Sequence, residues 1–310
     1  MLDVKRLRLL WELDRRGTVI AVADALHQSS SAVSQQLALL EREVGVTLLR
    51  RSGRVLELTP AAQVLVAETE NVLRAVEQAA DAVQQKQPQV TGKLRVAAFQ
   101  TAMLALLPQA IQRIRRNHPG VHIELIQYEP ELALRETWLR NFDLVIAEQY
   151  PEHATEQFAG LESKPLTRDK IQLALPRTPD SSPEFQSVKT LSDTQHLPWV
   201  MEPKGTATRH FAEQACRLAG FEPDVRFETA DLQAHVRLVA TGNAVALLPS
   251  LVHFGSPYSK ANDIKLLDLP GSPRRTIFTA ARKSSRKNAA LKAFRQVLET
   301  EAAALQTETI

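Results

Sequence analysis

Cysteine and glycine are scarce in this chain of 310 residues, and each scarcity excludes a class of site. Cys216 is the only cysteine, which excludes an internal disulfide framework and a cysteine-rich metal site. It lies in a helical pattern beside Ala215 and Leu218, so we interpret it as a buried structural thiol and not as a redox sensor. The 11 glycines are too few and too scattered for a dinucleotide-binding fingerprint.

Long apolar runs are absent as well. No run approaches the roughly 18 residues that a membrane-spanning helix needs, and the N-terminus is charged from Asp3 to Arg8 and contains no apolar signal region. We therefore expect a cytoplasmic protein. The net charge of +3 is too small to indicate a partner, because basic groups must cluster to attract an anionic surface.

The sequence also lacks the common enzyme motifs. It has no Gly-x-Ser-x-Gly elbow, no Gly-x-x-x-x-Gly-Lys phosphate loop and no His-Glu-x-x-His zinc helix. The 8 histidines show no ligand spacing, and acidic pairs such as Glu129 and Glu131 lie at turn edges, where carboxylates are usually solvated. We therefore expect no catalysis, no metal ion and no cofactor.

What the chain does contain is the composition of an ordinary globular protein, with 44% hydrophobic and 24% charged residues. Its length exceeds one typical domain, so we expect two or three folded units.

Residues 18–60 predict a helix, a tight turn, a second helix and a β-hairpin. Thr18 is a suitable N-cap for a short helix over 19–26. A longer helix follows over Ser30–Val44, in which apolar residues three or four apart form one buried stripe. The stripe consists of Val33, Leu37, Leu40 and Val44.

The opposite face of the longer helix carries Ser31, Ser34, Gln35 and Ala38. These short groups suit base edges in a major groove. The same face also fits an ordinary helical bundle, so the residues alone leave DNA binding and protein–protein contact both open.

Residues 48–58 predict the hairpin, because two short apolar runs flank a Ser-Gly turn. Three arginines, Arg50, Arg51 and Arg54, lie near its tip. Cations beside a polar helix face are well placed to contact a phosphate backbone, although an arginine-rich turn is often only solvated.

These residues resemble the winged helix-turn-helix of the LysR-type transcriptional regulators, and the match runs without gaps. It consists of Ala23-Asp24-Ala25-Leu26-His27, Ser29, Ala32-Val33-Ser34-Gln35-Gln36-Leu37, Leu40-Glu41, Val44-Gly45-Val46, Leu48-Leu49-Arg50-Arg51 and Leu58-Thr59-Pro60-Ala61. The chain departs from the family pattern at Val22, Ser30, Ser31, Leu49 and Ala62. We expect DNA contacts from Thr18, Ser29, Ser30, Ser31, Ser34, Gln35, Arg50, Arg51 and Arg54.

A long helix begins at Thr59 and Pro60, a typical N-cap and first position, and ends near residue 87 before Pro88 and Gly92. Two series repeat along it every seven residues. One consists of Leu65, Val72 and Ala79, and the other of Thr69, Val76 and Val83. We expect this seam to pair two copies of the chain, although packing onto its own chain is the alternative; the family resemblance implies the same pairing. The seam consists of Leu65, Val72, Val76, Ala79 and Val83.

From residue 91 onward strands and helices alternate, which predicts a mostly parallel sheet covered by helices. Expected strands cover 93–99, 121–128, 143–147, 171–175, 199–201, 225–228, 244–248 and 275–281. Expected helices cover 103–116, 131–139, 206–219, 232–240 and 288–305, with a surface loop at 177–183.

Three segments of this half also resemble the LysR-type effector domain, at residues 92–96, 142–147 and 239–249. The resemblance implies the two-lobed α/β fold of periplasmic solute-binding proteins (type 2). The predicted architecture is a winged helix-turn-helix (1–58), a linker and dimerisation helix (59–90), lobe I (91–165 and 270–310) and lobe II (166–269).

Ligands of open α/β sheets bind beyond the carboxyl ends of the strands, where helix N-termini offer free N–H groups. Polar residues at these positions are the expected effector contacts: Gln100, Thr101, Gln149, Thr206 and Thr229. The alternative for Thr101 and Thr206 is that each only caps a helix.

The charge of the effector stays open at this point. Lys204 and Arg209 favour an acidic ligand, whereas Glu148 and Glu202 favour the opposite.

Taken together, we expect a bacterial LysR-type regulator that forms a homodimer and then a homotetramer. Its expected partners are double-stranded operator DNA, a small-molecule effector bound between the lobes, and RNA polymerase. The alternative is a cytoplasmic small-molecule binding protein whose N-terminal helices mediate protein–protein contacts.

Overall fold

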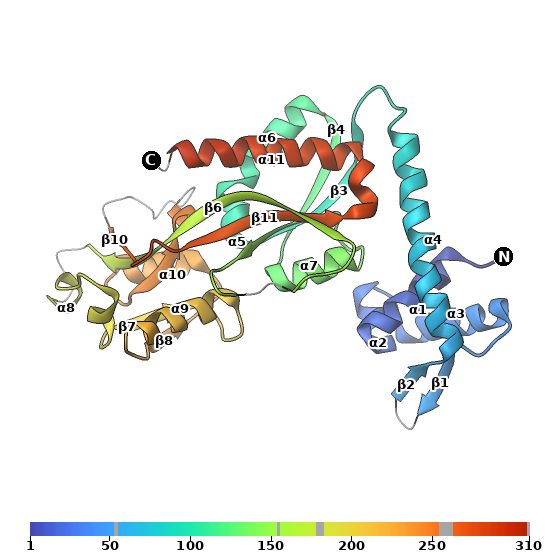
Figure 1. Ribbon diagram of the computed structural model, residues 1–310, viewed down its shortest axis with the longest axis horizontal. Coiled ribbons are helices and arrows are strands. Elements are labelled where there is room, and N and C mark those ends of the chain that lie inside the picture. Colours follow the sequence, from blue (N-terminus) through green and yellow to red (C-terminus); the bar gives the residue numbers. More distant parts are fainter. Residues whose placement is uncertain (53–54, 154–155, 178–182, 254–262, 309–310) are drawn as a thin grey trace. The chain divides into compact units, whose positions relative to one another are not determined.

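The computed structural model describes residues 1–52, 55–153, 156–177, 183–253 and 263–308. The chain divides into two compact units, Met1–Lys86 and Gln87–Ile310, both drawn in Figure 1. Within the described ranges, none of the helices is both long and apolar enough to cross a bilayer, and no cluster of His, Cys, Asp or Glu residues is suited to a metal ion. The hairpin residue Arg54 and most of the predicted 177–183 loop lie outside the described residues.

The described part of the N-terminal unit consists of capped helices and a β-hairpin. Its elements are α1 (Val4–Arg16), α2 (Val19–Ala25), α3 (Ser30–Val44), β1 (Leu49–Ser52), β2 (Val55–Leu58) and α4 (Pro60–Gln84). A side-chain oxygen of Asp3, Thr18, Ser29 or Thr59 accepts a backbone N–H at the start of each helix. Buried Leu10, Trp11, Leu37 and Leu40 form its core, so the predicted helix-turn-helix arrangement is present.

The C-terminal unit carries the remaining elements. In lobe I they are β3 (Thr91–Ala98), α5 (Gln100–Ala105), α6 (Leu107–Asn117), β4 (Gly120–Gln127), α7 (Pro130–Trp138), β5 (Leu144–Gln149), β11 (Arg274–Arg282), η3 (Lys283–Lys287) and α11 (Ala289–Glu308). The long strand β6 (Leu161–Pro176) begins there and continues into lobe II. In lobe II they are α8 (Pro183–Gln186), η1 (Leu191–Thr194), β7 (Pro198–Met201), α9 (Ala207–Leu218), β8 (Asp224–Glu228), α10 (Leu232–Ala240), β9 (Ala246–Pro249), η2 (Ser250–His253) and β10 (Ile264–Asp268).

The main sheet has the strand order β10-β6-β11-β5-β3-β4, with β9 also paired to β6. Strand β3 is parallel to β4 and β5, and β7 is parallel to β8. The prediction of a mostly parallel sheet is wrong for the rest, because β6 pairs antiparallel with β9, β10 and β11, and β11 with β5. The cause is that the chain crosses between the lobes twice: β6 and β11 run in opposite directions along the unit (Figure 1).

Two further elements differ from the sequence prediction. The helix expected over 103–116 is divided at Leu106 into α5 and α6, because Pro108 cannot continue a helix and instead occupies the first turn of α6. Strand β6 begins at Leu161, well before the predicted 171–175 segment. Its first half is largely exposed and charged, so it lacks the apolar run that signals a buried strand.

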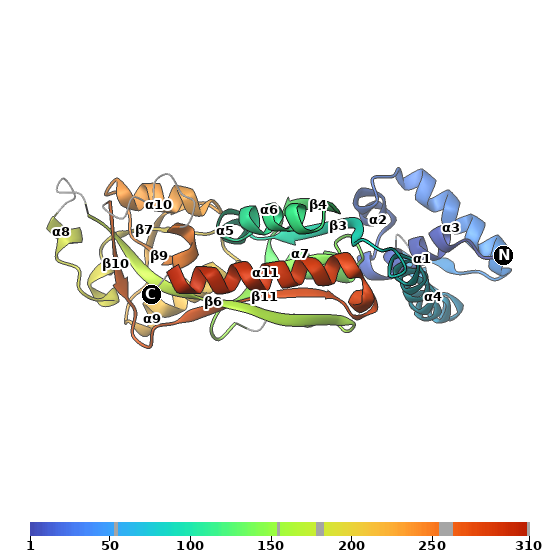
Figure 2. The ribbon, with the colours of Figure 1, turned by 90° about the horizontal axis from the view of Figure 1, so that it is seen from above.

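Separate apolar cores lie in the two lobes. In lobe I, α6 and α11 pack on one face of the sheet and α7 on the other, as Figures 1 and 2 both show. In lobe II, α9 and α10 belong to two further clusters. Tyr150 packs in the lobe II core and Leu251 in the lobe I core, so the side chains interlock across the two lobes. The fold is thus the predicted two-lobed α/β type; the lobe boundaries stay a prediction.

Candidate DNA-binding and effector-binding sites

Helix α3 separates apolar and polar faces as its sequence predicts. Val33, Leu37 and Leu40 are buried as predicted and Val44 is only half-buried, whereas Ser30, Ser31, Ser34 and Gln35 are exposed. This exposure matters because a side chain must reach out of the unit to meet a base edge. Within this unit the polar face of α3 is therefore available for a partner.

Thr18 and Ser29 have a structural role that does not exclude them from DNA contact. The Thr18 hydroxyl accepts the Ala21 N–H at 3.1 Å, and the Ser29 hydroxyl accepts the Ala32 N–H at 3.1 Å. The Ser29 and Ser31 hydroxyls are 3.0 Å apart. These caps fix where α2 and α3 begin, and so they set the direction of the polar face.

The hairpin arginines differ in their surroundings. Arg50 donates from Nε and Nη2 to one Glu57 oxygen, at 3.2 and 3.1 Å, a cross-strand pair that the sequence analysis did not foresee. Arg51 is exposed and forms no ion pair with any residue that the structure describes. It is therefore the described hairpin cation best able to reach a phosphate.

Helix α4 uses one side for its own unit and leaves the predicted seam uncovered. Ala62, Val66, Thr69 and Leu73 are buried, and α4 packs against α1. Thr69 is thus part of the intramolecular side, not of the seam. Along the predicted seam, Val72 is 36% exposed, Val76 50% and Val83 67%; Ala79 is also exposed, and Leu65 is half-buried. A single copy of the unit leaves this apolar stripe in solvent.

Two predicted effector residues, Gln100 and Thr229, meet at the start of α10. The Gln100 amide donates to Asp231 Oδ1 at 2.7 Å, and its oxygen accepts the Leu232 N–H at 2.8 Å. The Thr229 hydroxyl accepts the Asp231 N–H at 3.1 Å. Gln100 therefore joins lobe I to the N-terminus of a lobe II helix.

Thr101 lies deeper and contacts a residue that the sequence analysis missed. It is fully buried, and its hydroxyl accepts a hydrogen bond from Arg275 Nη2 at 2.7 Å. Arg275 is 1% exposed; it donates to Asp169 from Nε at 2.9 Å and from Nη2 at 2.6 Å, and to Glu148 from Nη1. Its guanidinium also lies over the Phe99 ring. Thr101 is therefore part of a buried ion-pair cluster and not simply a helix cap.

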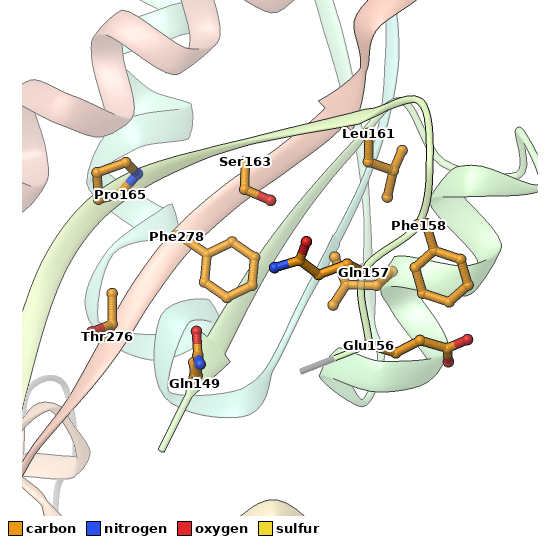
Figure 3. A pocket seen from close by; sticks show the side chains of 10 residues that line it. Gln149, Glu156, Gln157, Phe158, Leu161, Ser163, Pro165, Thr276 and Phe278 are labelled. Carbon is orange, nitrogen blue, oxygen red and sulfur yellow. The ribbon is translucent and has the colours of Figure 1, made fainter. Parts of the chain in front are cut away.

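Gln149 lines a pocket of about 460 Å³ in lobe I. Figure 3 shows β6 and β11 supplying one wall, with Ser163 and Phe278, and the segment 156–158 supplying another. The Gln149 amide donates to the His153 carbonyl at 3.2 Å. Glu156 is the only charged side chain among the lining residues that the structure describes.

Thr206 lines a second pocket, of about 890 Å³, together with His153. Its hydroxyl caps α9 by accepting the Arg209 N–H at 3.2 Å. Arg209 is buried and paired with Glu213 at 2.6 Å and Glu228 at 3.3 Å. The five predicted residues therefore divide among the Asp231 contact, the Arg275 cluster and two neighbouring pockets.

Comparison with known proteins assigns both parts of the chain to one family. Residues 4–63 match the bacterial regulatory helix-turn-helix protein, lysR family, and residues 87–303 match the LysR substrate binding domain. The chain belongs to the LysR family of transcriptional regulators. It carries the family's helix-turn-helix DNA-binding domain and its effector-binding domain, in that order.

Individual relatives agree with this assignment. The transcriptional dual regulator GltC of Bacillus subtilis is 30% identical over 249 residues, 80% of this chain and 81% of GltC. The Escherichia coli regulator IlvY is 28% identical, over 86% of this chain and 88% of its own. These relatives are transcriptional regulators and not enzymes.

Solved structures match the whole fold. A full-length OxyR variant from Pseudomonas aeruginosa has a TM-score of 0.66 at 20% identity, covering 96% of this chain and 95% of that one. Full-length CbnR in complex with its target DNA has a TM-score of 0.52 at 22% identity, covering 97% and 100%.

Burial changes the acid–base properties of the LysR-type effector domain. Burial raises the pKa of Glu148 to about 7 against the opposing effect of Arg275, and raises the pKa of Glu202 to about 8, helped by the Glu148 charge. Burial also raises the pKa of the Tyr150 hydroxyl. The Cys216 thiol is buried, and its pKa rises to about 12, which agrees with a structural thiol.

Local sequence patterns indicate some of these residues but not others. Glu148 and Glu202 could be recognised, because each lies where a buried strand ends at the sheet edge. Arg275 and Asp169 could not, because they are 106 residues apart and meet only through the register of β11 on β6.

Proposed function

We propose that this LysR-type regulator binds operator DNA through the exposed face of α3 and the hairpin β1–β2. It acts as a homodimer paired through α4, assembled further into a homotetramer. A small-molecule effector binds between the two lobes and changes the spacing of the DNA-binding units. The protein works in the cytoplasm with RNA polymerase as a further partner, and it needs neither catalysis nor a cofactor.

The observation that carries this proposal is the exposed polar face of α3. Ser30 and Ser31 lie in its first turn, where the positive end of the helix dipole favours phosphate. Ser34 and Gln35 are one turn further on and meet base edges. A good bidentate base contact is worth about 1–3 kcal/mol, and short side chains give the lower end, so DNA shape and half-site spacing supply further specificity.

The hairpin contributes phosphate contacts. Arg51 is exposed and reaches a phosphate directly, and we assign the same role to Arg54 on sequence grounds. Arg50 first has to leave Glu57, but an exposed ion pair of this kind contributes only about 0–1 kcal/mol, so a phosphate competes for it easily.

The seam on α4 supports the homodimer. Val72, Val76 and Val83 are exposed at heptad spacing on a helix whose other side already packs on α1. A second copy of the same stripe would cover them in the manner of a coiled coil.

The rival function is a small-molecule binding protein whose N-terminal helices contact another protein. A measurement of DNA binding distinguishes this rival from the proposed regulator function. We therefore propose to measure binding to a duplex selected from a random pool and to an unselected random duplex, over a range of salt concentrations, for the wild type, Arg51→Ala and Gln35→Ala.

Arg51→Ala should weaken binding to both duplexes alike and lower the slope of log K against log salt by about one, because one phosphate contact is lost. Gln35→Ala should weaken only the selected duplex, by roughly tenfold or less. Arg116→Ala, an exposed arginine on α6, is the matched control and should change neither. Absence of binding at low salt favours the rival; an altered sequence preference alone in Arg51→Ala contradicts the phosphate role.

A further inference from the structure

The lobe I pocket of about 460 Å³ and the Arg275 cluster lie on opposite faces of the main sheet. Successive side chains of a strand point to opposite faces, so Thr276 and Phe278 share the face of β11 that Arg275 does not. Thr276 lies opposite Gln149 on β5, and Phe278 lies opposite Pro165 on β6. All four line the pocket, so three adjacent strands form one of its walls (Figure 3).

An irregularity in the strand pairing directs β6 toward this pocket. The pairing of β6 with β11 leaves Leu166 without an opposite residue, between Thr167 and Pro165, as in a β-bulge. Leu166 packs against the core beneath α6 and α11, on the other face of the sheet. Pro165 has no N–H to donate to a neighbouring strand and is tolerated at such a position. Pro165 and Ser163, two residues apart, therefore both face the pocket.

Aromatic rings stand on two walls of the pocket. Figure 3 shows Phe278 on the wall formed by β11 and Phe158 on the wall formed by the segment 156–158. Trp138 of α7 holds this segment: its ring centroid lies 5.6 Å from that of Phe158, and its Nε1 donates to the Ala159 carbonyl at 3.0 Å. The fold therefore fixes both rings. The other apolar lining residues are Leu134, Leu161 and Pro165.

Uncharged polar groups complete the lining, and most lack a protein partner. The Gln149 amide donates to the His153 carbonyl, but its own oxygen accepts no hydrogen bond within the described ranges. The same part of the chain offers no hydrogen-bond partner to the side chains of Gln157, Ser163 and Thr276. Amides and hydroxyls both donate and accept, so a ligand with either kind of group can bind here.

The same lining disfavours a charged ligand. No lysine or arginine is among the lining residues that the structure describes, so a bound carboxylate or phosphate would lose water without gaining a counter-charge. Glu156, the one charged side chain described there, would repel an anion. Glu156 is exposed, so an ion pair between it and a cation would contribute little.

The geometry points to a second small-molecule site in lobe I, for an uncharged aromatic compound that carries a hydroxyl or an amide group. Its ring packs between the walls that carry Phe158 and Phe278, and its polar group bonds to Gln149 or Gln157. Small-molecule pockets of roughly 300–1,000 Å³ have this mainly apolar lining with a few polar groups. The site goes beyond the proposed function, which places the effector between the lobes; only Gln149 is shared with the predicted effector contacts.

Isothermal titration calorimetry of the full-length protein at neutral pH, without DNA, tests the assignment. The probes are benzamide and phenol as uncharged aromatics, benzoate and benzylammonium as charged aromatics, and cyclohexanecarboxamide as an uncharged compound without an aromatic ring. We expect benzamide or phenol to bind with a Kd of about 1 mM or tighter. Both charged probes should bind roughly tenfold or more weakly. Cyclohexanecarboxamide should bind about two- to tenfold more weakly than benzamide, because it lacks the ring–ring contacts.

Exposed residues of the two walls supply the variants. Ser163→Phe should weaken binding roughly tenfold or more, because its ring takes up volume that the ligand needs. Lys164→Phe is the matched control: it introduces the same ring one residue further along β6, on the other face, and should leave binding unchanged. Gln157→Ala should weaken binding about two- to tenfold through the loss of one hydrogen bond. Circular dichroism checks that each variant is folded.

Trp138 fluorescence locates the bound probe. Because Trp138 packs against Phe158, benzamide should change its emission, and Trp138→Phe should remove that change. An unchanged emission would place the ligand elsewhere and overturn the assignment.

Other results also overturn it. They are no binding by either uncharged aromatic probe, a charged probe that binds as tightly as benzamide, or benzamide binding that survives in Ser163→Phe. Equal binding of cyclohexanecarboxamide and benzamide contradicts the aromatic preference. DNA binding is measured without these probes, so a failure of this site remains distinguishable from a failure of the regulator function.

Discussion

The candidate DNA contacts of the N-terminal unit and the ion-pair cluster of the effector domain lie in opposite environments. In the N-terminal unit Ser34, Gln35 and Arg51 are exposed and lie outside the core. In the effector domain Arg275 and Glu202 are almost completely buried. An exposed contact surface can change its specificity without changing the fold, whereas a buried polar site makes ligand recognition and stability depend on the same residues. Substitutions at the exposed N-terminal residues should therefore alter binding, whereas substitutions in the buried cluster of the effector domain should also alter folding.

The largest expected effect on folding is at Arg275. Its replacement by Ala leaves Asp169 and Glu148 buried without their cation, and breaking a buried ion pair typically costs about 3–5 kcal/mol. We expect urea unfolding followed by circular dichroism to show this loss in the effector domain. Arg286→Ala is the matched control, because that side chain is 78% exposed, and its effect should stay within about 0.5 kcal/mol. If Arg275→Ala lowered the free energy of unfolding by less than about 1 kcal/mol, the buried cluster would not stabilise the effector domain as we expect.

This cluster also marks the limit of what the sequence predicts. Helices α3 and α10 begin and end where the sequence places them, because Ser29 and Asp231 cap them and their apolar residues recur at helical spacing. Such signals are local. The pairing of Arg275 with Asp169 depends on two strands that are distant in sequence and adjacent in register, and no local pattern reports that register.

The charges of the candidate site could be predicted only in part. The sequence indicates that the charges of Glu148 and Glu202 oppose those of Lys204 and Arg209, but it cannot show which of these charges have partners. Packing decides this: Arg209 is paired with Glu213 and Glu228, and Glu202 has no ion pair among the described residues. Long basic and acidic side chains reach partners that sequence spacing does not specify.

A second effect concerns pH and is spread over several pH units. The pKa of Glu202 is raised in the folded state, so between its ordinary value near 4.5 and about 8 the folded protein holds a proton that the unfolded chain has released. The contribution of this bound proton to the free energy of unfolding is fully present at the acidic end of that range and is lost as pH rises through about 8. The loss approaches about 1 kcal/mol per pH unit.

Glu202→Gln should therefore flatten the dependence of the unfolding free energy on pH between about 5 and 8, and should stabilise the protein relative to the wild type at pH 8. Denaturant unfolding at several pH values measures this. Glu148 titrates in the same range, with a pKa of about 7, so some slope remains in the variant. A slope equal to that of the wild type would show that Glu202 does not bind the proton.

The smallest effect on folding is expected at the exposed seam of α4. Val72→Asp replaces a partly exposed apolar side chain, so the free energy of unfolding within one N-terminal unit should change by about 0.5 kcal/mol or less. The association of two chains should nevertheless fail, because an unpaired carboxylate would be buried in an apolar interface. Sedimentation should show a lower mass. Ala67→Asp, an exposed position that roughly 100° per residue places well away from the seam, should leave the mass unchanged. An unchanged mass for Val72→Asp would remove the seam from the interface and assign dimerisation to another surface.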